Sequence, residues 1–95
     1  MATQVRNVPE KARYEILRDG ELVGIAEYVD RGGVLVFHHT EISAPLRGDG
    51  LGAELVTAAL DDVRARGQRI IPTCWYVAEF VEQHPDYGNL VATSG

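Results

Sequence analysis

The most reactive side chain in this sequence is that of Cys74, its single cysteine. It follows a short apolar run, "QRIIPTC", which predicts a strand, and precedes "WYVAEFVEQH", which predicts a helix. The positive end of a helix dipole favours the thiolate form of a nearby cysteine. Cys74 is therefore a candidate nucleophile. The alternative is a small buried apolar residue, which is the usual role of a lone cysteine.

The candidates for acid–base chemistry are the adjacent histidines His38 and His39 and a nearby carboxylate, Glu41. Imidazole exchanges a proton near neutral pH and suits the role of general base. Neighbouring residues of a strand face opposite sides, so one histidine is expected to face a given crevice. Glu41 shares the face of His39 by the two-residue period and could act as a base through water or orient an acceptor. The alternative is that these are ordinary half-buried or solvated strand residues.

Three glycines stand directly before a well-patterned helix in the stretch "LRGDGLGAELVTAAL". The first N–H groups of a helix have no partner within it, and a glycine-rich approach lets a phosphate come close to them. The segment from Arg47 to Gly52 is therefore a candidate anion-binding loop. "GDGLG" is also similar to part of a dinucleotide fingerprint, although its third glycine comes too early. "RGD" is an adhesion tripeptide, and a plain turn with a helix cap is a further alternative.

The elements that must position these residues predict an α+β fold. Alternating patterns over 12–18, 21–30 and 34–42 predict an antiparallel meander with turns at "DG" and "RGG". An apolar stripe from Leu51 to Val63 predicts a helix capped by Gly67, and a strand and a second helix ended by His84-Pro85 follow. Strand, helix and strand form one right-handed βαβ crossover, which leaves a crevice at the carboxyl ends of its strands. "NLVA" is either a short last strand or a tail.

Length and composition set the outer limits of this interpretation. The 95 residues are enough for one small domain, expected over 12–95, after a weakly patterned segment over 1–11 that is expected to be a loose leader. The formal charge of −5 argues against general binding to nucleic acid or an anionic membrane. A single cysteine and the lack of an apolar signal core favour a reducing, cytoplasmic compartment. No side-chain spacing predicts a metal site.

Four blocks in order, "HTEI", "LRGDGLG", "IIPTCWYVAEF" and "HPDY", resemble the GCN5-related N-acetyltransferases. The R-x-x-G-x-G spacing of Arg47, Gly50 and Gly52 is similar to the pyrophosphate loop of that family. The closest resemblance is to its very short, single-domain subgroup, in which a cysteine ends the second parallel strand. The resemblance covers roughly Tyr14 to Val91.

The resemblance implies that acetyl-CoA binds between the two parallel strands. Backbone groups of Thr40 and Ile42 would line its pantetheine arm, and the loop would hold the pyrophosphate through Arg47, Gly48, Gly50, Leu51 and Gly52. The implied activity is direct transfer of an acetyl group to an amine, with Cys74, His39 and Glu41 as catalytic candidates. An acetyl intermediate on Cys74 is the second mechanism.

Two departures from the family pattern matter. The chain has no room for the N-terminal helices that shape the acceptor pocket in larger members, so the acceptor site is expected to be open or completed by another molecule. Asp49 stands where many members carry a cation or neutral residue, and it is expected to point to solvent. The rival function is a non-enzymatic module that binds CoA, acyl-CoA or a protein, and the expected state is a monomer or weak homodimer.

Overall fold

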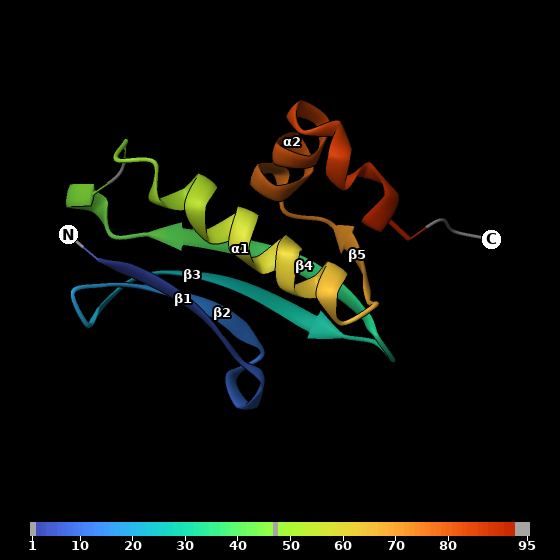
Figure 1. Cartoon of the computed structure of the whole chain (residues 1–95), viewed down its shortest axis with the longest axis horizontal. Helices are drawn as coiled ribbons and strands as arrows, with labels where there is room; N and C mark the ends of the chain where they lie inside the picture. Colours follow the sequence, from blue (N-terminus) through green and yellow to red (C-terminus); the bar gives the residue numbers. More distant parts are fainter. Residues whose placement is uncertain (1, 47, 93–95) are drawn as a thin grey trace.

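The computed structural model describes residues 2–46 and 48–92, which form a five-stranded mixed sheet with two α-helices (Figure 1). The strands stand in chain order, with β1 to β4 antiparallel and β5 parallel to β4. The strands and helices are β1 Thr3–Val8, β2 Arg13–Arg18, β3 Glu21–Asp30, β4 Val34–Ile42, α1 Leu51–Ala65, β5 Arg69–Pro72 and α2 Trp75–Gln83. Three short 3-10 turns, Pro9–Lys11, Ala44–Leu46 and Pro85–Leu90, complete the chain. The predicted α+β architecture is confirmed.

The loose leader expected over 1–11 is wrong. Thr3–Val8 forms β1 and pairs with β2 along its whole length, with Val5 opposite Ile16. β1 is an edge strand whose apolar residues are few, so its sequence carries little alternation. Its polar residues are held by partners from other strands: Asn7 accepts a hydrogen bond of 2.7 Å from the Tyr28 hydroxyl, and Arg6 pairs with Glu15.

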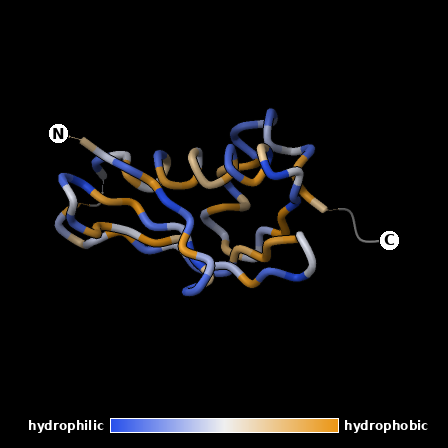
Figure 2. The backbone as a smooth tube through the Cα atoms, turned by 60° about the horizontal axis from the view of Figure 1, so that its bottom comes forward, coloured by the Kyte–Doolittle hydropathy of each residue, from blue (hydrophilic) through white to orange (hydrophobic). Residues whose placement is uncertain are grey.

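Both helices cover one face of the sheet, and the core lies between the two layers (Figures 1 and 2). The predicted stripe of α1 is confirmed, since its members Leu51, Leu55, Val56, Ala59, Leu60 and Val63 are all buried. The sheet contributes the aromatic cluster of Tyr14, Tyr28 and Phe37, whose ring centroids lie 5.6 to 6.1 Å apart. Burying one such Leu or Val side chain contributes roughly 1.5–3 kcal/mol, so the stripe is what fixes α1 on the sheet.

The ends of the helices follow the local signals in the sequence. Gly67 has a φ of 68°, the left-handed conformation that suits a helix C-terminus. α2 stops at Gln83, and the Nδ1 of His84 lies 2.8 Å from the carbonyl oxygen of Phe80. The "NLVA" segment makes one isolated parallel bridge, between Val91 and Ile70, rather than a strand. Neither described helix is long and apolar enough to cross a membrane.

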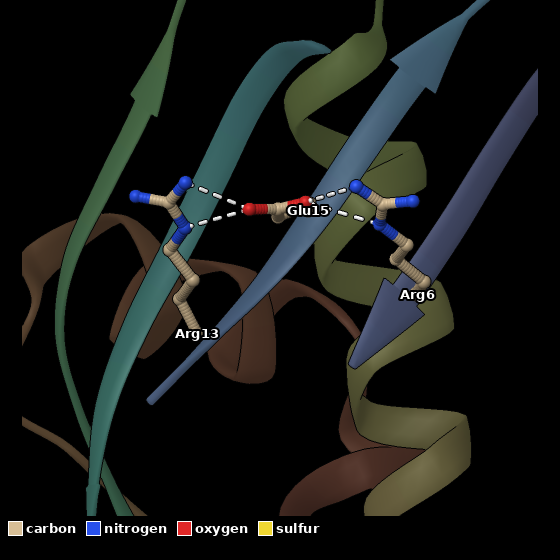
Figure 3. Close-up of polar contacts among 3 residues, drawn as sticks. All are labelled: Arg6, Arg13 and Glu15. Atoms are coloured by element: carbon tan, nitrogen blue, oxygen red, sulfur yellow. Dashed lines mark hydrogen bonds and ion pairs between the residues drawn. The ribbon is translucent and has the colours of Figure 1, made fainter. Parts of the chain in front are cut away.

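The face of the sheet opposite the helices holds a buried carboxylate, Glu15, between two arginines (Figure 3). Arg6 donates to one oxygen of Glu15 through Nε and Nη2 at 3.0 and 2.9 Å. Arg13 contacts the other oxygen through Nε and Nη2 at 2.9 and 2.7 Å. Burial alone would raise the pKa of Glu15, but the hydrogen bonds from Arg13 and Arg6 outweigh it and lower that pKa. The alternation over 12–18 places Arg13 and Glu15 on one face of the strand, as the structure does, but it gives no sign that Glu15 is buried.

Candidate cofactor and active site

The cleft of this protein opens where β4 and β5 stop pairing. Their ladder runs from Val34 opposite Arg69 to Phe37 opposite Pro72, and Pro72 has no N–H with which to extend it. The N–H groups of Thr73 and Cys74 and the Thr73 hydroxyl converge on the Phe37 carbonyl oxygen, at 3.0, 2.9 and 3.1 Å. These bonds hold the end of β5 at Phe37, and beyond that point the chain turns into α2 while β4 continues alone to Ile42.

A cavity of about 860 Å³ lies between the last part of β4, the start of α2 and the start of α1. This volume is within the usual range for small-molecule sites. Every described residue predicted for the site lines it: His39, Thr40, Glu41, Ile42, Gly48, Gly50, Leu51, Gly52 and Cys74. Arg47, predicted to add a positive charge, lies outside the described residues. The cavity is also lined by His38, Leu46, Thr73, Trp75 and Tyr76.

The N-terminus of α1 presents its N–H groups to this cavity without a side-chain cap. Gly50, the N-cap residue, has a φ of 79°, and Gly48 has a φ of 95°, both in the left-handed region that glycine adopts readily. The first N–H of the helix to bond within it is that of Glu54, 3.1 Å from the Gly50 carbonyl oxygen. Among the described residues, none accepts from the N–H groups of Leu51, Gly52 or Ala53. These donors, at the positive end of the helix dipole, suit an anionic group.

Asp49 does not oppose this use of the loop. Its carboxylate pairs with Arg18 of β2 at 3.3 Å, and its side chain is half exposed. The expectation that Asp49 points to solvent is therefore correct for part of its surface only. The ion pair with Arg18 keeps the negative charge on the β2 side of the loop, where a separate, smaller cavity lies.

Position 52 requires glycine because the side chain of Tyr76 packs against it, a contact that the sequence pattern does not indicate. A Cβ added to Gly52 would lie 2.6 Å from the hydroxyl oxygen of Tyr76 and 3.0 Å from its Cζ. The Tyr76 phenol of α2 therefore rests on the first turn of α1. The glycine spacing of the loop does not indicate this contact, because Tyr76 lies 24 positions further along the chain.

The catalytic candidates form two separate groups. Cys74 is buried at the start of α2, and its Sγ lies 3.7 Å from the Thr40 hydroxyl oxygen. Thr40 pairs with buried Ala26, whereas His39 pairs with Glu27 on the helix-free face. The Nε2 of His39 lies 3.4 Å from a carboxylate oxygen of Glu41. The thiol and the imidazole are therefore on opposite sides of β4.

The expectation that only one of the adjacent histidines faces the crevice is wrong. A β-bulge stands at this point, where Tyr28 pairs with Phe37 and Glu27 pairs with His39, and His38 is the extra residue. The bulge interrupts strict alternation. Both histidines consequently line the cavity, with His38 the more exposed.

Trp75 is the most exposed large apolar side chain among the described residues, with 73% of its surface accessible. It opens α2 beside Cys74, and its indole meets the ring of Tyr76 edge to face at 5.9 Å. The sequence alone leaves Trp75 as a residue either of the core or of a cofactor wall; its exposure excludes the first, and its place in the cavity lining agrees with the second.

These features define a two-layer α+β domain with a cleft at the end of the parallel β4–β5 pair, beside the N-terminus of the crossover helix. The sequence matches the family model of the GCN5-related N-acetyltransferases over residues 13–90, and the chain belongs to that family.

Known relatives agree with this assignment. Protein NATD1 of Bos taurus is 39% identical over 59 residues, which are 62% of this chain and 51% of that protein, so the match spans about half the length of the relative. Protein NATD1 of Danio rerio is 32% identical over 94 residues, covering 92% of this chain and 84% of that protein. A GCN5-like protein of Staphylococcus aureus, solved by NMR, superposes with a TM-score of 0.71 at 18% identity and covers 97% of this chain and 90% of its own. The last likeness shows that the fold occurs in another protein of similarly short length.

Proposed function

We propose that this protein transfers an acetyl group from acetyl-CoA to an amine. The observation that carries the proposal is the meeting, in one cleft, of an uncapped helix N-terminus with a His39–Glu41 pair and the Cys74 thiol. Membership of the acetyltransferase family supports it.

The donor set of the cleft fits the chemistry of CoA. The N–H groups of Leu51 and Gly52, which have no acceptor among the described residues, would hold the pyrophosphate. The stretch of β4 from Thr40 to Ile42, which lies beyond its pairing with β5, would line the pantetheine arm. When bound, acetyl-CoA supplies an acetyl group activated as a thioester. The acidic protein thus needs no broad basic surface to hold an anionic cofactor.

The residues on the helix-free face of β4 would prepare the acceptor. An ammonium group must lose a proton before its nitrogen can attack a carbonyl carbon, and His39 Nε2 would take that proton. Glu41 Oε1, 3.4 Å away, would stabilise the resulting imidazolium. No described helix covers this face of the sheet, so the acceptor would approach from it (Figure 1). Direct transfer is favoured over a Cys74 intermediate because the thiol is on the other side of the strand.

The test of this function combines native mass spectrometry with CoA and measurement of acetyl-CoA consumption over a panel of amines. We expect a one-to-one CoA complex and amine-dependent consumption. Failure to bind CoA would reject both this function and the rival CoA-binding module. CoA binding without turnover on small amines, amino acids, polyamines or lysine peptides would favour the rival.

A further inference from the structure

Tyr76 differs from the other three tyrosines of the chain in the hydrogen bonding of its hydroxyl. The hydroxyls of Tyr14, Tyr28 and Tyr87 donate to Asp62, Asn7 and Asp61 at 2.6, 2.7 and 2.7 Å. Within residues 2–46 and 48–92, no group hydrogen-bonds to the hydroxyl of Tyr76, although its ring is partly buried. Because no described side-chain oxygen is both buried and unpartnered, the Tyr76 hydroxyl is open to the cleft, where a ligand can accept its hydrogen bond.

The Tyr76 hydroxyl lies in the space left by the missing side chain of Gly52. Because a Cβ on Gly52 would come within 2.6 Å of it, the Tyr76 oxygen lies against the first turn of α1. Glycine inside a helix weakens the helix relative to alanine. Here it leaves the space that the phenol occupies, beside the N–H groups of Leu51 and Gly52 that have no acceptor among the described residues.

The electrostatic setting favours a neutral donor at this point. The described lining of the cavity includes neither lysine nor arginine, and the donors it offers to an anion are N–H and O–H groups. Burial first, and then the charge of Glu79, raise the pKa of Tyr76. The phenol therefore keeps its proton at neutral pH and acts as a donor.

We propose that the Tyr76 hydroxyl is part of the phosphate cradle and donates a hydrogen bond to the pyrophosphate of CoA beside the α1 N–H groups. The inference rests on the proposed binding of CoA and adds a side chain of α2 to the N–H groups at the start of α1. It also assigns Gly52 a second task, which is to make room for that hydroxyl.

The test uses CoA and pantetheine as probes, titrated into the whole protein by calorimetry and NMR. Pantetheine has no pyrophosphate, so only CoA should respond to Tyr76→Phe. We expect Tyr76→Phe to raise the Kd for CoA about tenfold, as for the loss of one hydrogen bond to a charged acceptor. Its Kd for pantetheine should not change. Tyr87→Phe, which removes a phenol hydroxyl bonded to Asp61, is the matched control and should leave both values unchanged.

Three outcomes separate the possible failures. If the wild-type protein does not bind CoA, the proposed function itself is rejected. If the wild type binds CoA and Tyr76→Phe binds it equally well, only the role of Tyr76 is overturned. An equal loss of affinity for CoA and for pantetheine also overturns the role of the hydroxyl, because Tyr76 would then contact the pantetheine part of CoA and not its pyrophosphate.

A double-mutant cycle gives an independent check. Gly52→Ala should displace the Tyr76 ring through the close contact with the new Cβ and weaken CoA binding. In the Tyr76→Phe background, Gly52→Ala should weaken CoA binding only slightly further, since the hydroxyl is already absent. Fully additive losses would show that the two residues act separately and would overturn the proposal.

Discussion

The thiol of Cys74 lies 3.7 Å from the hydroxyl of Thr40, on the core side of β4. His39 and Glu41 are on the other side of the same strand. A cysteine nucleophile is normally activated by a base within hydrogen-bond reach, and a threonine hydroxyl is not such a base. The geometry therefore places the Cys74 thiol and the His39–Glu41 pair on opposite sides of β4, where under the proposed function the thiol would lie beside the cofactor and the imidazole beside the acceptor.

The first prediction follows from that separation. Cys74→Ala should leave the affinity for CoA unchanged and reduce acetyl transfer without abolishing it, because direct transfer does not require the thiol. The measurement is the rate of acetyl-CoA consumption, together with the intact mass of the protein. Complete loss of turnover in the variant, with an acetyl adduct present in the wild type and absent in Cys74→Ala, would instead establish the covalent route.

The second prediction concerns the base. His39→Gln should lower kcat/KM by about 10²–10⁴, the usual contribution of general base catalysis, and leave the Kd for CoA near the wild-type value. His38→Gln is the matched control, since His38 lines the same cavity but is the extra residue of the bulge. A large decrease in kcat/KM for His38→Gln, with little change for His39→Gln, would contradict the assignment of His39 as the base.

The sequence predicted those parts of the fold that local patterns determine. The apolar stripe of α1, the turn at Asp19-Gly20 and the end of α2 before Pro85 each depend on neighbours within a few positions. β1 was missed because an edge strand is stabilised by its partner: its polar residues bond to side chains from β2 and β3. The burial of Glu15 was missed for the same reason, since Arg6 lies in another element.

The residues that line the cleft were predicted by resemblance, but their arrangement was not. The contact of Tyr76 with Gly52 joins the two helices, and no periodicity within either helix reports it. The division of Cys74 from His39 depends on the register of β4 against β3 and on the bulge at His38. Such features are set by tertiary packing, which a single sequence does not display.

A third prediction tests the backbone of the loop. Gly50→Ala should lower the free energy of unfolding by about 1 kcal/mol, because alanine at a φ of 79° is strained although no atom obstructs its Cβ. It should also weaken CoA binding, because it disfavours the left-handed conformation of residue 50 that leaves the first N–H groups of α1 open to a ligand. Gly88→Ala, which is equally unobstructed and has no positive φ, should change stability by less than about 0.5 kcal/mol. Denaturant unfolding and calorimetry with CoA provide the two measurements, and equal behaviour of the two variants would refute the argument.

A fourth prediction concerns acid stability. The pKa of Glu15 is lowered in the folded state, so its ionised form stabilises the fold above the unfolded pKa of about 4.3, and this contribution is lost as the pH falls through the lower, folded pKa. Glu15→Gln should therefore be less stable than the wild type at pH 7, by about 1–3 kcal/mol, and lose less stability on acidification. Urea unfolding between pH 7 and pH 3 measures both effects. The exposed Glu10→Gln should follow the wild-type curve, and parallel curves for wild type and Glu15→Gln would contradict the prediction.

The last prediction concerns Trp75, whose indole is 73% exposed at the mouth of the cleft. An aromatic surface of this size that packs on little of the protein contributes little to folding, so Trp75→Ala should change stability by less than about 0.5 kcal/mol. The exposed ring offers an apolar face to an acceptor, and also a cation–π contact worth about 0.5–2 kcal/mol to an ammonium group. We therefore expect Trp75→Ala to raise the KM for the amine while kcat and the Kd for CoA remain near wild-type values. Val29→Ala is the matched control, because Val29 is a 46% exposed apolar residue that does not line the cleft. Should Trp75→Ala weaken CoA binding and leave the amine KM unchanged, the indole would be a wall of the cofactor channel and not of the acceptor site.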